Sequence, residues 1–228
     1  MSELYRPIYL NKGPLIFTSR RTAELIKYAS NSFLAMKVTF INEMADLSEA
    51  VGANVQDVAR VIGLDKRIGS KFLNSGPGFG GSCFPKDAVA LVKTANDYER
   101  PVSLIETTIA VNDRRKRAMA RKVIDAVGGS VRGKRIAMLG LTFKPNTDDM
   151  RDAPALAIAQ ALKDGGANIS AFDPEGMEQA KNELPFLDFC GDPYAAVEGA
   201  YALVIVTEWD QFRALYFARL IDVMAQPI

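Results

Sequence analysis

The 228-residue sequence predicts an α/β protein in which a helical domain with one long helix precedes a doubly wound parallel-sheet domain. Three observations favour this fold. Apolar residues recur at helical spacing, without Gly or Pro, from Thr22 to about Val51. The pair Gly128-Gly129 then marks a boundary. Beyond it, short apolar runs alternate with helical segments, as is typical of parallel sheets that bind ligands beyond the carboxyl ends of their strands.

The first segment, residues 1–20, has a weaker pattern. Its stretch Pro14–Ser19 (PLIFTS) is a candidate for a short strand, although no partner strand lies nearby in the sequence. We interpret residues 1–20 as the remnant of a preceding domain.

The long helix carries two apolar lines. The first steps by three or four residues and the second runs beside it; their members are Leu25, Ala29, Phe33, Met36, Phe40, Met44, Leu47 and Val51, and then Ile26, Leu34, Val38, Ile41 and Ala45. Two apolar faces on one helix predict burial on both sides, by another domain or another subunit.

Shorter elements follow the long helix. Val55–Ile62 is predicted to be an amphipathic helix, and Asp65–Gly69 a polar loop. Ala88–Tyr98 is predicted to be a helix with Asp87 as its N-cap. A further long helix is expected to open at Pro101 and to reach toward Val127.

That last helix contains the basic run Arg114–Arg117. Since a run of like charges usually forms a solvated face, we interpret it as solvent-exposed.

The C-terminal domain contains three predicted buried strands, at Arg135–Gly140, Asn168–Phe172 and Ala202–Val206. A helix between the first two has Asp152 as its expected cap, an early Pro and a terminal Gly pair. A helix, a strand and a helix are predicted before Glu198, and one further helix over Trp209–Met224.

Composition excludes several classes of function. Lys+Arg 28 against Asp+Glu 27 gives a net charge of +1, which offers no electrostatic support for nucleic-acid binding. With no histidine, Ser-His-Asp and Cys-His hydrolases are excluded. The two cysteines are too few for a disulfide framework and too far apart for a metal site. No apolar run approaches the ~20 residues of a membrane span and no signal peptide is evident, so we expect a cytoplasmic protein that contacts no membrane.

The segment Gly76–Asp87 (GPGFGGSCFPKD) carries the chemistry. Its glycines and prolines predict a sharply turned, rigid loop, which presents Cys83 with Lys86 and Asp87 just behind it. A nearby ammonium and a helix N-terminus both favour thiolate, the nucleophilic form of cysteine, and the carboxylate can orient a water molecule. We therefore predict a covalent catalytic site, whereas Cys190 is expected to be a buried, neutral thiol.

Three stretches resemble one known family. Phe72–Asp87 (FLNSGPGFGGSCFPKD) is similar to the active-site loop of the UDP-glucose/GDP-mannose dehydrogenase family. Glu24–Asn31 (ELIKYASN) resembles the central-helix motif of that family, and Gly140–Arg151 (GLTFKPNTDDMR) resembles its C-terminal nucleotide-sugar domain.

The resemblance implies a domain arrangement and an activity. Residues 1–20 would be the remnant of an N-terminal, NAD-binding Rossmann domain that is missing from this chain. Residues 21–128 would be the central helical domain, dimerising through the long helix 22–51 as a homodimer. Residues 129–228 would be a truncated Rossmann-like domain that binds UDP. The implied reaction is NAD-dependent, two-step oxidation of UDP-glucose to UDP-glucuronate through a thiohemiacetal and a thioester at Cys83, and the fragment alone is expected to be inactive.

Residue roles also follow from the resemblance. The implied catalytic residues are Cys83, Lys27, Asn31 and Asp87, in which the lysine and asparagine hold the reacting oxygen of the sugar. The implied substrate-binding residues are Arg67, Phe72, Leu73, Asn74, Ser75, Gly76, Gly80 and Lys144, with Arg67 reaching the substrate of the neighbouring subunit. Lys86 and Arg151 are implied to bind the cofactor, and no metal is expected.

One pattern imitates a dinucleotide-binding fingerprint. Gly140 follows a strand and Asp173 follows the next, but the turn lacks the second and third glycines, and Phe143 and Pro145 would block a pyrophosphate. We therefore do not expect this domain alone to bind NAD. The alternatives left open are a GDP-mannose or UDP-N-acetylmannosamine dehydrogenase, of which the FPKD ending of the loop argues against the second, and a non-catalytic dimerising module that binds a nucleotide sugar.

Overall fold

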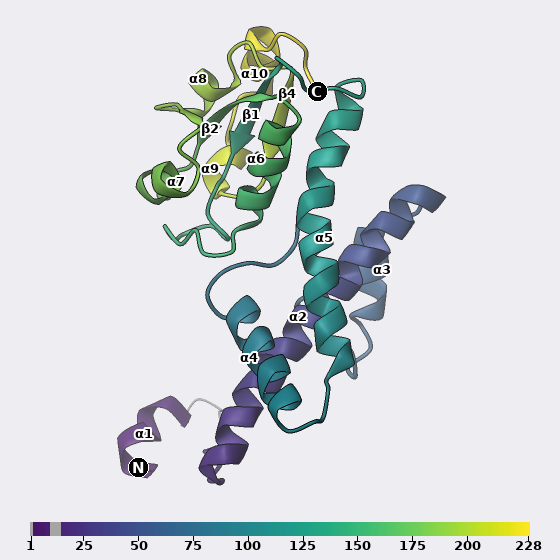
Figure 1. Cartoon of the computed structure of the whole chain (residues 1–228), viewed down its shortest axis with the longest axis vertical. Coiled ribbons are helices and arrows are strands. Elements are labelled where there is room, and N and C mark those ends of the chain that lie inside the picture. The colour runs from purple at the N-terminus through teal and green to yellow at the C-terminus, as the bar shows by residue number, and fades with distance from the viewer. Residues whose placement is uncertain (1, 10–14) are drawn as a thin grey trace.

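The computed structural model describes residues 2–9 and 15–228. The described residues of the helical half form five helices, α1 Ser2–Tyr9, α2 Arg20–Val51, α3 Val55–Ile62, α4 Phe84–Asp97 and α5 Ser103–Ala126. Helices α2, α4 and α5 pack against one another, and the two long helices α2 and α5 cross (Figure 1). Within the described ranges, none of the helices is both long and apolar enough to traverse a bilayer.

Helix α2 confirms the predicted long helix. Ser19 caps its start by accepting a hydrogen bond from the Thr22 amide at 3.2 Å, and Gly52 ends it in the left-handed conformation with φ 71°. The face buried within the chain carries mostly small or polar residues, namely Asn31, Ser32, Ala35, Thr39, Ile41, Asn42, Ala45 and Ser48. The larger apolar side chains of the first predicted line, Leu25, Phe33, Phe40, Leu47 and Val51, are exposed. Of the two apolar lines predicted to be buried, only the second therefore reaches the core of this chain, through Ile41 and Ala45.

The predicted strand at Pro14–Ser19 is wrong over the residues that the structure describes. Residues 15–19 have no regular secondary structure, and Pro14 lies outside the described residues. A strand requires a partner for its backbone groups, and helix α2 begins directly after this segment.

The C-terminal half contains a four-stranded sheet in the order β3-β2-β1-β4, in which all neighbouring strands are parallel. The strands are β1 Arg135–Leu139, β2 Asn168–Phe172, β3 Asp188–Phe189 and β4 Ala202–Ile205. The helices that connect and follow them are α6 Pro154–Asp164, α7 Met177–Glu183, α8 Pro193–Val197, α9 Asp210–Arg213 and α10 Phe217–Val223.

Strand β1 shows why the sheet is covered on both faces. Ile136 and Met138 belong to a core cluster with residues of α6, including Ile158, whereas Ala137 and Leu139 pack into two clusters with residues of α8, α9 and α10. Successive side chains of a strand point to opposite faces, so β1 is buried on both. The doubly wound sheet predicted from the sequence is confirmed.

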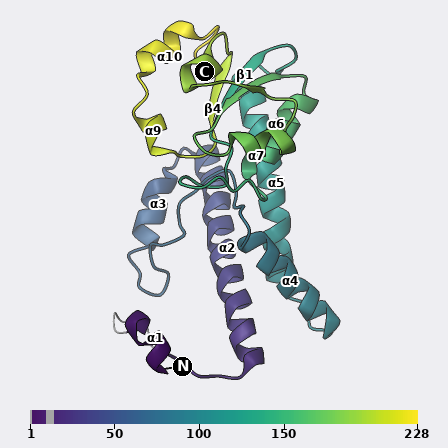
Figure 2. The same ribbon diagram turned by 90° about the vertical axis from the view of Figure 1, so that its left-hand side faces the viewer.

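Helix α5 joins the two halves. Its C-terminal part supplies Ala120, with Val127 just beyond its end, to the core cluster beneath α6, while its N-terminal part packs against α2 and α4 (Figures 1 and 2). The loop that carries Cys83 follows α3 and leads into α4, and it reaches the C-terminal half, where its Gly81 amide donates to the Arg151 carbonyl at 2.8 Å.

Besides the start of α4, which is described with Cys83 below, three predicted element boundaries are wrong. Helix α5 begins at Ser103 with Val102 as its N-cap, rather than at Pro101. Asp152 does not cap α6; it adopts a left-handed conformation with φ 51°, and Ala153 is the N-cap. The single helix predicted over Trp209–Met224 is two short helices, α9 and α10.

Candidate active site

Cys83 lies at the start of helix α4. It occupies the N-cap position with Pro85 in the first turn, and its thiol is free and exposed. The hydroxyl of Ser82 lies 3.8 Å from its sulfur atom. An anion that forms at this sulfur therefore lies at the positive end of the α4 helix dipole. The predicted cap was wrong: Asp87 lies inside the first turn, where its amide donates to the Cys83 carbonyl at 2.9 Å.

A polar cluster forms around the Asp87 carboxylate. Asn31 Nδ2 donates to Asp87 Oδ2 at 2.5 Å, and the side chain of Asp87 is only 5% exposed. Lys27 Nζ lies 3.7 Å from Oδ2, and Lys86 Nζ lies 3.8 Å from Oδ1. The structure thus brings Lys27, Asn31 and Asp87 together one helical turn from Cys83. The long helix α2 supplies two of them because residues four apart lie on one face.

The backbone of the loop is held by asparagine side chains. The Gly76 amide donates to Asn42 Oδ1 at 2.8 Å. Asn112 binds both backbone groups of Phe79, accepting from its amide at 2.8 Å and donating to its carbonyl at 3.1 Å. The Gly81 amide donates to the Arg151 carbonyl at 2.8 Å, which links the loop to the sheet half. A glycine-rich loop without strand partners is thus fixed through its main chain.

The interpretation of Arg114–Arg117 as a wholly solvated face is wrong. Arg114 and Arg117 are exposed, but Arg115 and Lys116 are buried at 8% and 7% exposure. Arg115 contacts the loop and α2, while Lys116 Nζ donates to the Asp152 carbonyl at 3.1 Å. Burial lowers the pKa of Lys116, and the nearby carboxylates of Asp113 and Asp152 partly oppose that shift.

A cavity of about 670 Å³ lies where the loop meets the carboxyl ends of the strands. It is lined by four of the predicted substrate-binding residues, Asn74, Ser75, Gly76 and Lys144. Arg213 of α9 and Thr207 also line it, and sequence reasoning missed both. The sequence signal that could have found them is their place in the segment that follows β4, Thr207 directly after the strand and Arg213 in α9, because ligands of doubly wound sheets bind beyond the strand ends.

The other predicted substrate-binding residues do not line this cavity. The Phe72 ring packs at 5.9 Å from that of Phe84, and Leu73 is buried. Gly80 packs against the Asp152 backbone. Arg67 extends from the loop after α3, where its Nη2 pairs with Asp65 at 2.6 Å.

The two predicted cofactor-binding residues line one cavity. Lys86 and Arg151, together with Ser82, border a space of about 540 Å³ beside the cysteine. Arg151 donates through Nε and Nη2 to Asp149 at 2.9 and 2.8 Å. This pairing raises the pKa of Arg151 and lowers that of Asp149. Both cations suit the phosphates of a nucleotide.

The turn after β1 has a structural role. Asp173 Oδ2 accepts from the amides of Leu141 at 2.6 Å and Thr142 at 3.1 Å, and from Trp209 Nε1 at 3.2 Å. A Cβ on Gly140 would lie 2.6 Å from Thr207. The Asp173 carboxylate, which stands where a dinucleotide fingerprint has its ribose-binding acidic residue, is therefore already hydrogen-bonded within the chain. The turn after β1 does not fit a dinucleotide.

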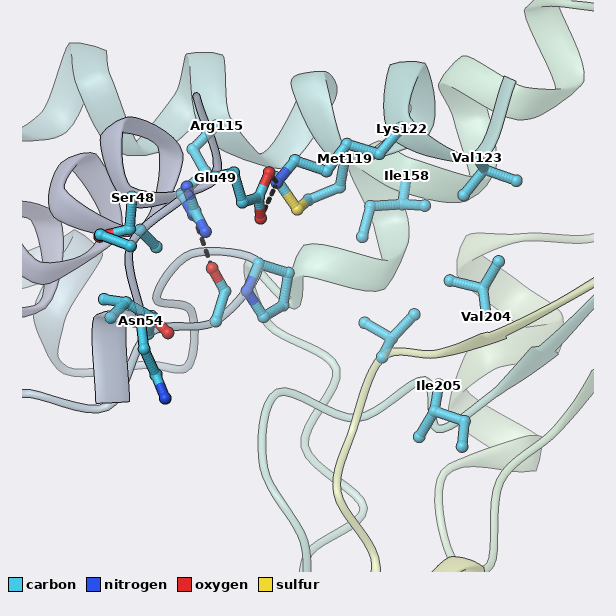
Figure 3. A pocket seen from close by; sticks show the side chains of 17 residues that line it. Ser48, Glu49, Asn54, Arg115, Met119, Lys122, Val123, Ile158, Val204 and Ile205 are labelled. Atoms are coloured by element: carbon cyan, nitrogen blue, oxygen red, sulfur yellow. Dashed lines mark hydrogen bonds and ion pairs between the residues drawn. The ribbon is translucent and has the colours of Figure 1, made fainter. Parts of the chain in front are cut away.

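A second large cavity shares part of its lining with the first (Figure 3). Its volume is about 590 Å³, and it shares Ser75–Pro77 with the first. One wall is polar and includes Arg115, whereas the sheet contributes Val204 and Ile205 (Figure 3). Cys83 does not line it, and within residues 2–9 and 15–228 no group of acidic or sulfur ligands forms a metal site.

Cys190 differs from Cys83 in its surroundings. It follows β3 and is half-buried, with Arg135 Nη2 at 3.9 Å from its sulfur. Burial, and then the neighbouring Asp188 carboxylate, raise the pKa of its thiol.

Comparison with known proteins decides the family. The central-domain model of the UDP-glucose/GDP-mannose dehydrogenase family matches residues 21–114, and the UDP-binding-domain model of the same family matches residues 137–228. The chain belongs to the UDP-glucose/GDP-mannose dehydrogenase family. The resemblance found in the sequence is confirmed, and the helical and sheet halves of the structure correspond to these matched regions.

Individual relatives agree with this family. The chain is 68% identical over 228 residues to a UDP-glucose 6-dehydrogenase of Rhizobium meliloti (strain 1021), covering 100% of this chain and 52% of the relative. It is 44% identical over 229 residues to UDP-glucose 6-dehydrogenase YwqF of Bacillus subtilis (strain 168), covering 100% of this chain and 51% of that one. The chain thus spans about half the length of the curated relatives it matches.

Solved structures of the family have the same fold. A UDP-glucose dehydrogenase from Pyrobaculum islandicum superposes with a TM-score of 0.87 at 32% identity, over 99% of this chain and 54% of that one. A UDP-D-ManNAc dehydrogenase from Pyrococcus horikoshii superposes with a TM-score of 0.79 at 26% identity, over 99% and 51%.

Proposed function

We propose that this chain forms the nucleotide-sugar-binding and nucleophile-bearing part of an NAD-dependent UDP-glucose 6-dehydrogenase. The observation that carries the proposal is the convergence of Lys27 and Asn31 on Asp87, one helical turn from Cys83, at one end of a loop whose other end lines a 670 Å³ cavity. A nucleophile and a sugar-nucleotide cavity on one rigid loop are what covalent oxidation of a bound sugar requires.

The proposed role of Cys83 is nucleophilic. Its sulfur adds to the C6 aldehyde of the half-oxidised sugar, and the carbonyl oxygen takes a proton, which gives a thiohemiacetal. Oxidation of this adduct leaves a thioester, and attack of water on the thioester releases the carboxylic acid and returns the thiol. NAD, when bound, supplies the chemistry of both oxidations by accepting two electrons and a proton from the sugar carbon each time.

The polar cluster would stabilise the oxygen that becomes negative in these steps. Lys27 and Asn31 are donors on one face of α2, and one well-placed donor supplies about 3 kcal/mol of transition-state stabilisation. Asp87 holds Asn31 through the 2.5 Å bond and would orient the attacking water. Lys86 and Arg151, which border the cavity beside Cys83, fit the phosphates of the cofactor.

We also propose a homodimer formed through α2, in the cytoplasm, where thiols stay reduced. The exposed apolar line Leu25, Phe33, Phe40, Leu47 and Val51 on α2 supports this interface, because a contiguous apolar stripe on a surface helix marks an interaction site. Arg67, which lies outside the cavity of its own chain, would then reach the substrate of the partner.

Calorimetric titration of the chain with UDP, UDP-glucose, GDP-mannose and UDP-N-acetylmannosamine tests the proposal. We expect UDP and UDP-glucose to bind and GDP-mannose to bind more weakly. Lys144→Ala, which alters the wall of the cavity, should weaken UDP binding, whereas Lys163→Ala, a lysine of α6 outside that cavity, should not. Tighter binding of GDP-mannose than of UDP-glucose would contradict the substrate assignment.

A further inference from the structure

Arg115 is a buried cation that the proposed chemistry does not use. Its Nε donates to the Gly76 carbonyl at 2.6 Å, and its Nη1 donates to the Asn42 carbonyl at 3.0 Å and to Asp46 Oδ2 at 2.8 Å. Its side chain is 8% exposed, whereas that of Asp46 is 53% exposed. The guanidinium therefore donates hydrogen bonds to two main-chain carbonyls, and the carboxylate that it pairs with is much more exposed than the guanidinium itself.

Asn42 completes a closed ring of contacts. Its Oδ1 accepts from the Gly76 amide at 2.8 Å, while its own carbonyl accepts from Arg115, which in turn donates to the Gly76 carbonyl. Both backbone groups of Gly76 are thus bound, one from α2 and one from α5. A residue held on both sides by two packed helices has little freedom to change its position.

Gly76 lines both of the large cavities. It lines the 670 Å³ cavity together with Asn74, Ser75 and Lys144, and it also lines the 590 Å³ cavity. Arg115 lines the 590 Å³ cavity and not the 670 Å³ cavity, and Figure 3 shows it among the polar residues of the wall. The guanidinium can therefore set the shape of the first cavity without occupying it.

Stability alone does not explain the arginine. A buried ion pair is often replaced by apolar residues of similar volume without loss of stability, because desolvation offsets the electrostatic gain. A planar group with several fixed donors is, however, suited to fixing several acceptors in one geometry.

We infer that Arg115 is a positioning residue that holds Gly76, and with it Asn74 and Ser75, in the geometry that binds the nucleotide sugar. This inference rests on the proposed function. It assigns to the middle of the basic run a role in substrate binding that is exerted through the loop.

The test compares Arg115→Met and Arg115→Lys with Arg117→Met, a matched change of the exposed arginine two positions further along the same helix. Two quantities are measured on the full chain, below its melting temperature. One is the hydrogen exchange of the peptide that spans residues 74–82, relative to peptides of the sheet half. The other is the affinity for UDP.

Arg115→Met should speed exchange in the loop peptide and weaken UDP binding by about tenfold, the equivalent of one hydrogen bond to a charged group. Exchange in the sheet half should stay unchanged. Arg115→Lys keeps the charge but has one donor atom, so it should lie between Arg115→Met and the wild type. Arg117→Met should match the wild type.

Two results would overturn the inference. In the first, the wild type binds UDP, and Arg115→Met has the same hydrogen exchange in the loop peptide as the wild type or the same affinity for UDP. In the second, exchange rises equally across the whole chain, which indicates a role in general stability. A wild type that binds no UDP refutes the proposed function instead, and the exchange of the loop then decides whether Arg115 positions it.

Discussion

Replacing Gly80 by alanine should destabilise the protein through one steric contact. A Cβ at this position would lie 2.9 Å from the carbonyl carbon of Asp152, closer still to the attached oxygen, and 3.2 Å from Ala153 Cα. These neighbours are backbone atoms, so no flexible side chain can move aside. Overpacking of this kind costs about 1–3 kcal/mol of the free energy of unfolding.

Gly76→Ala is the matched control in the same loop. No atom lies within 4 Å of a Cβ at Gly76, and neither glycine has a positive φ, so backbone strain does not distinguish the two. The control should change the free energy of unfolding by no more than about 0.5 kcal/mol.

Urea denaturation, followed by far-UV circular dichroism and by the fluorescence of the single tryptophan, Trp209, measures both variants. A Gly80→Ala variant that is as stable as Gly76→Ala would refute the contact between the cysteine loop and the segment before α6. It would also remove the steric reason for a glycine at this position.

Three further predictions follow from burial and charge. Burial lowers the pKa of Lys116, so its unfolded state binds more protons between the folded pKa and 10.5, and stability rises with pH across that window. Thermal melts at increasing pH should show this gain in the wild type and lose it in Lys116→Met; equal slopes would contradict it. Replacing Phe40 and Met44 of α2 by Asp should give a folded monomer in sedimentation, because an interface would bury unpaired charge; a folded variant that remains dimeric would place the interface elsewhere. Mass-mapped alkylation near neutral pH should label exposed Cys83 before Cys190, whose pKa is raised by burial, and the reverse order would refute the assignment of the nucleophile.

Much of the fold could be predicted from local patterns. The helical period, unbroken by Gly or Pro, predicted α2 to within two residues, and Gly52 ends the helix. The apolar runs predicted β1, β2 and β4 because central parallel strands are buried on both faces. The break between α9 and α10 contains no Gly or Pro from which it could have been predicted. It coincides with a tertiary contact, in which the Tyr216 amide donates to the Tyr194 hydroxyl at 3.0 Å.

The start of α4 could have been placed correctly. Pro85 favours the first helical turn, which pointed to a start at Phe84 and left Asp87 inside the helix. Asp87 was predicted to be the N-cap because aspartate is a preferred residue at that position. In the structure its carboxylate instead accepts a hydrogen bond from Asn31 of α2.

The candidate site was predicted through motifs, and the residues that hold it were not. Cys83 and Asp87 were predicted from the chemistry of the loop and Lys27 and Asn31 from the family resemblance, and the structure brings Lys27, Asn31 and Asp87 together. Arg115 was misjudged because charge alone suggests exposure. Two signals could have indicated that Arg115 is buried. It lies three residues after Asn112, on the same face of α5, and a glycine-rich loop needs hydrogen-bond donors for its carbonyls.

The most direct test of the central claim uses the aldehyde form of the substrate and needs no cofactor. UDP-glucose oxidised to the aldehyde at C6 and labelled there with carbon-13 is mixed with the chain, and the labelled carbon is followed by nuclear magnetic resonance. The account predicts a thiohemiacetal resonance with the wild type and with Cys190→Ala, and none with Cys83→Ala. A thiohemiacetal that persists in Cys83→Ala, or that disappears only in Cys190→Ala, would contradict the assignment of Cys83 as the nucleophile.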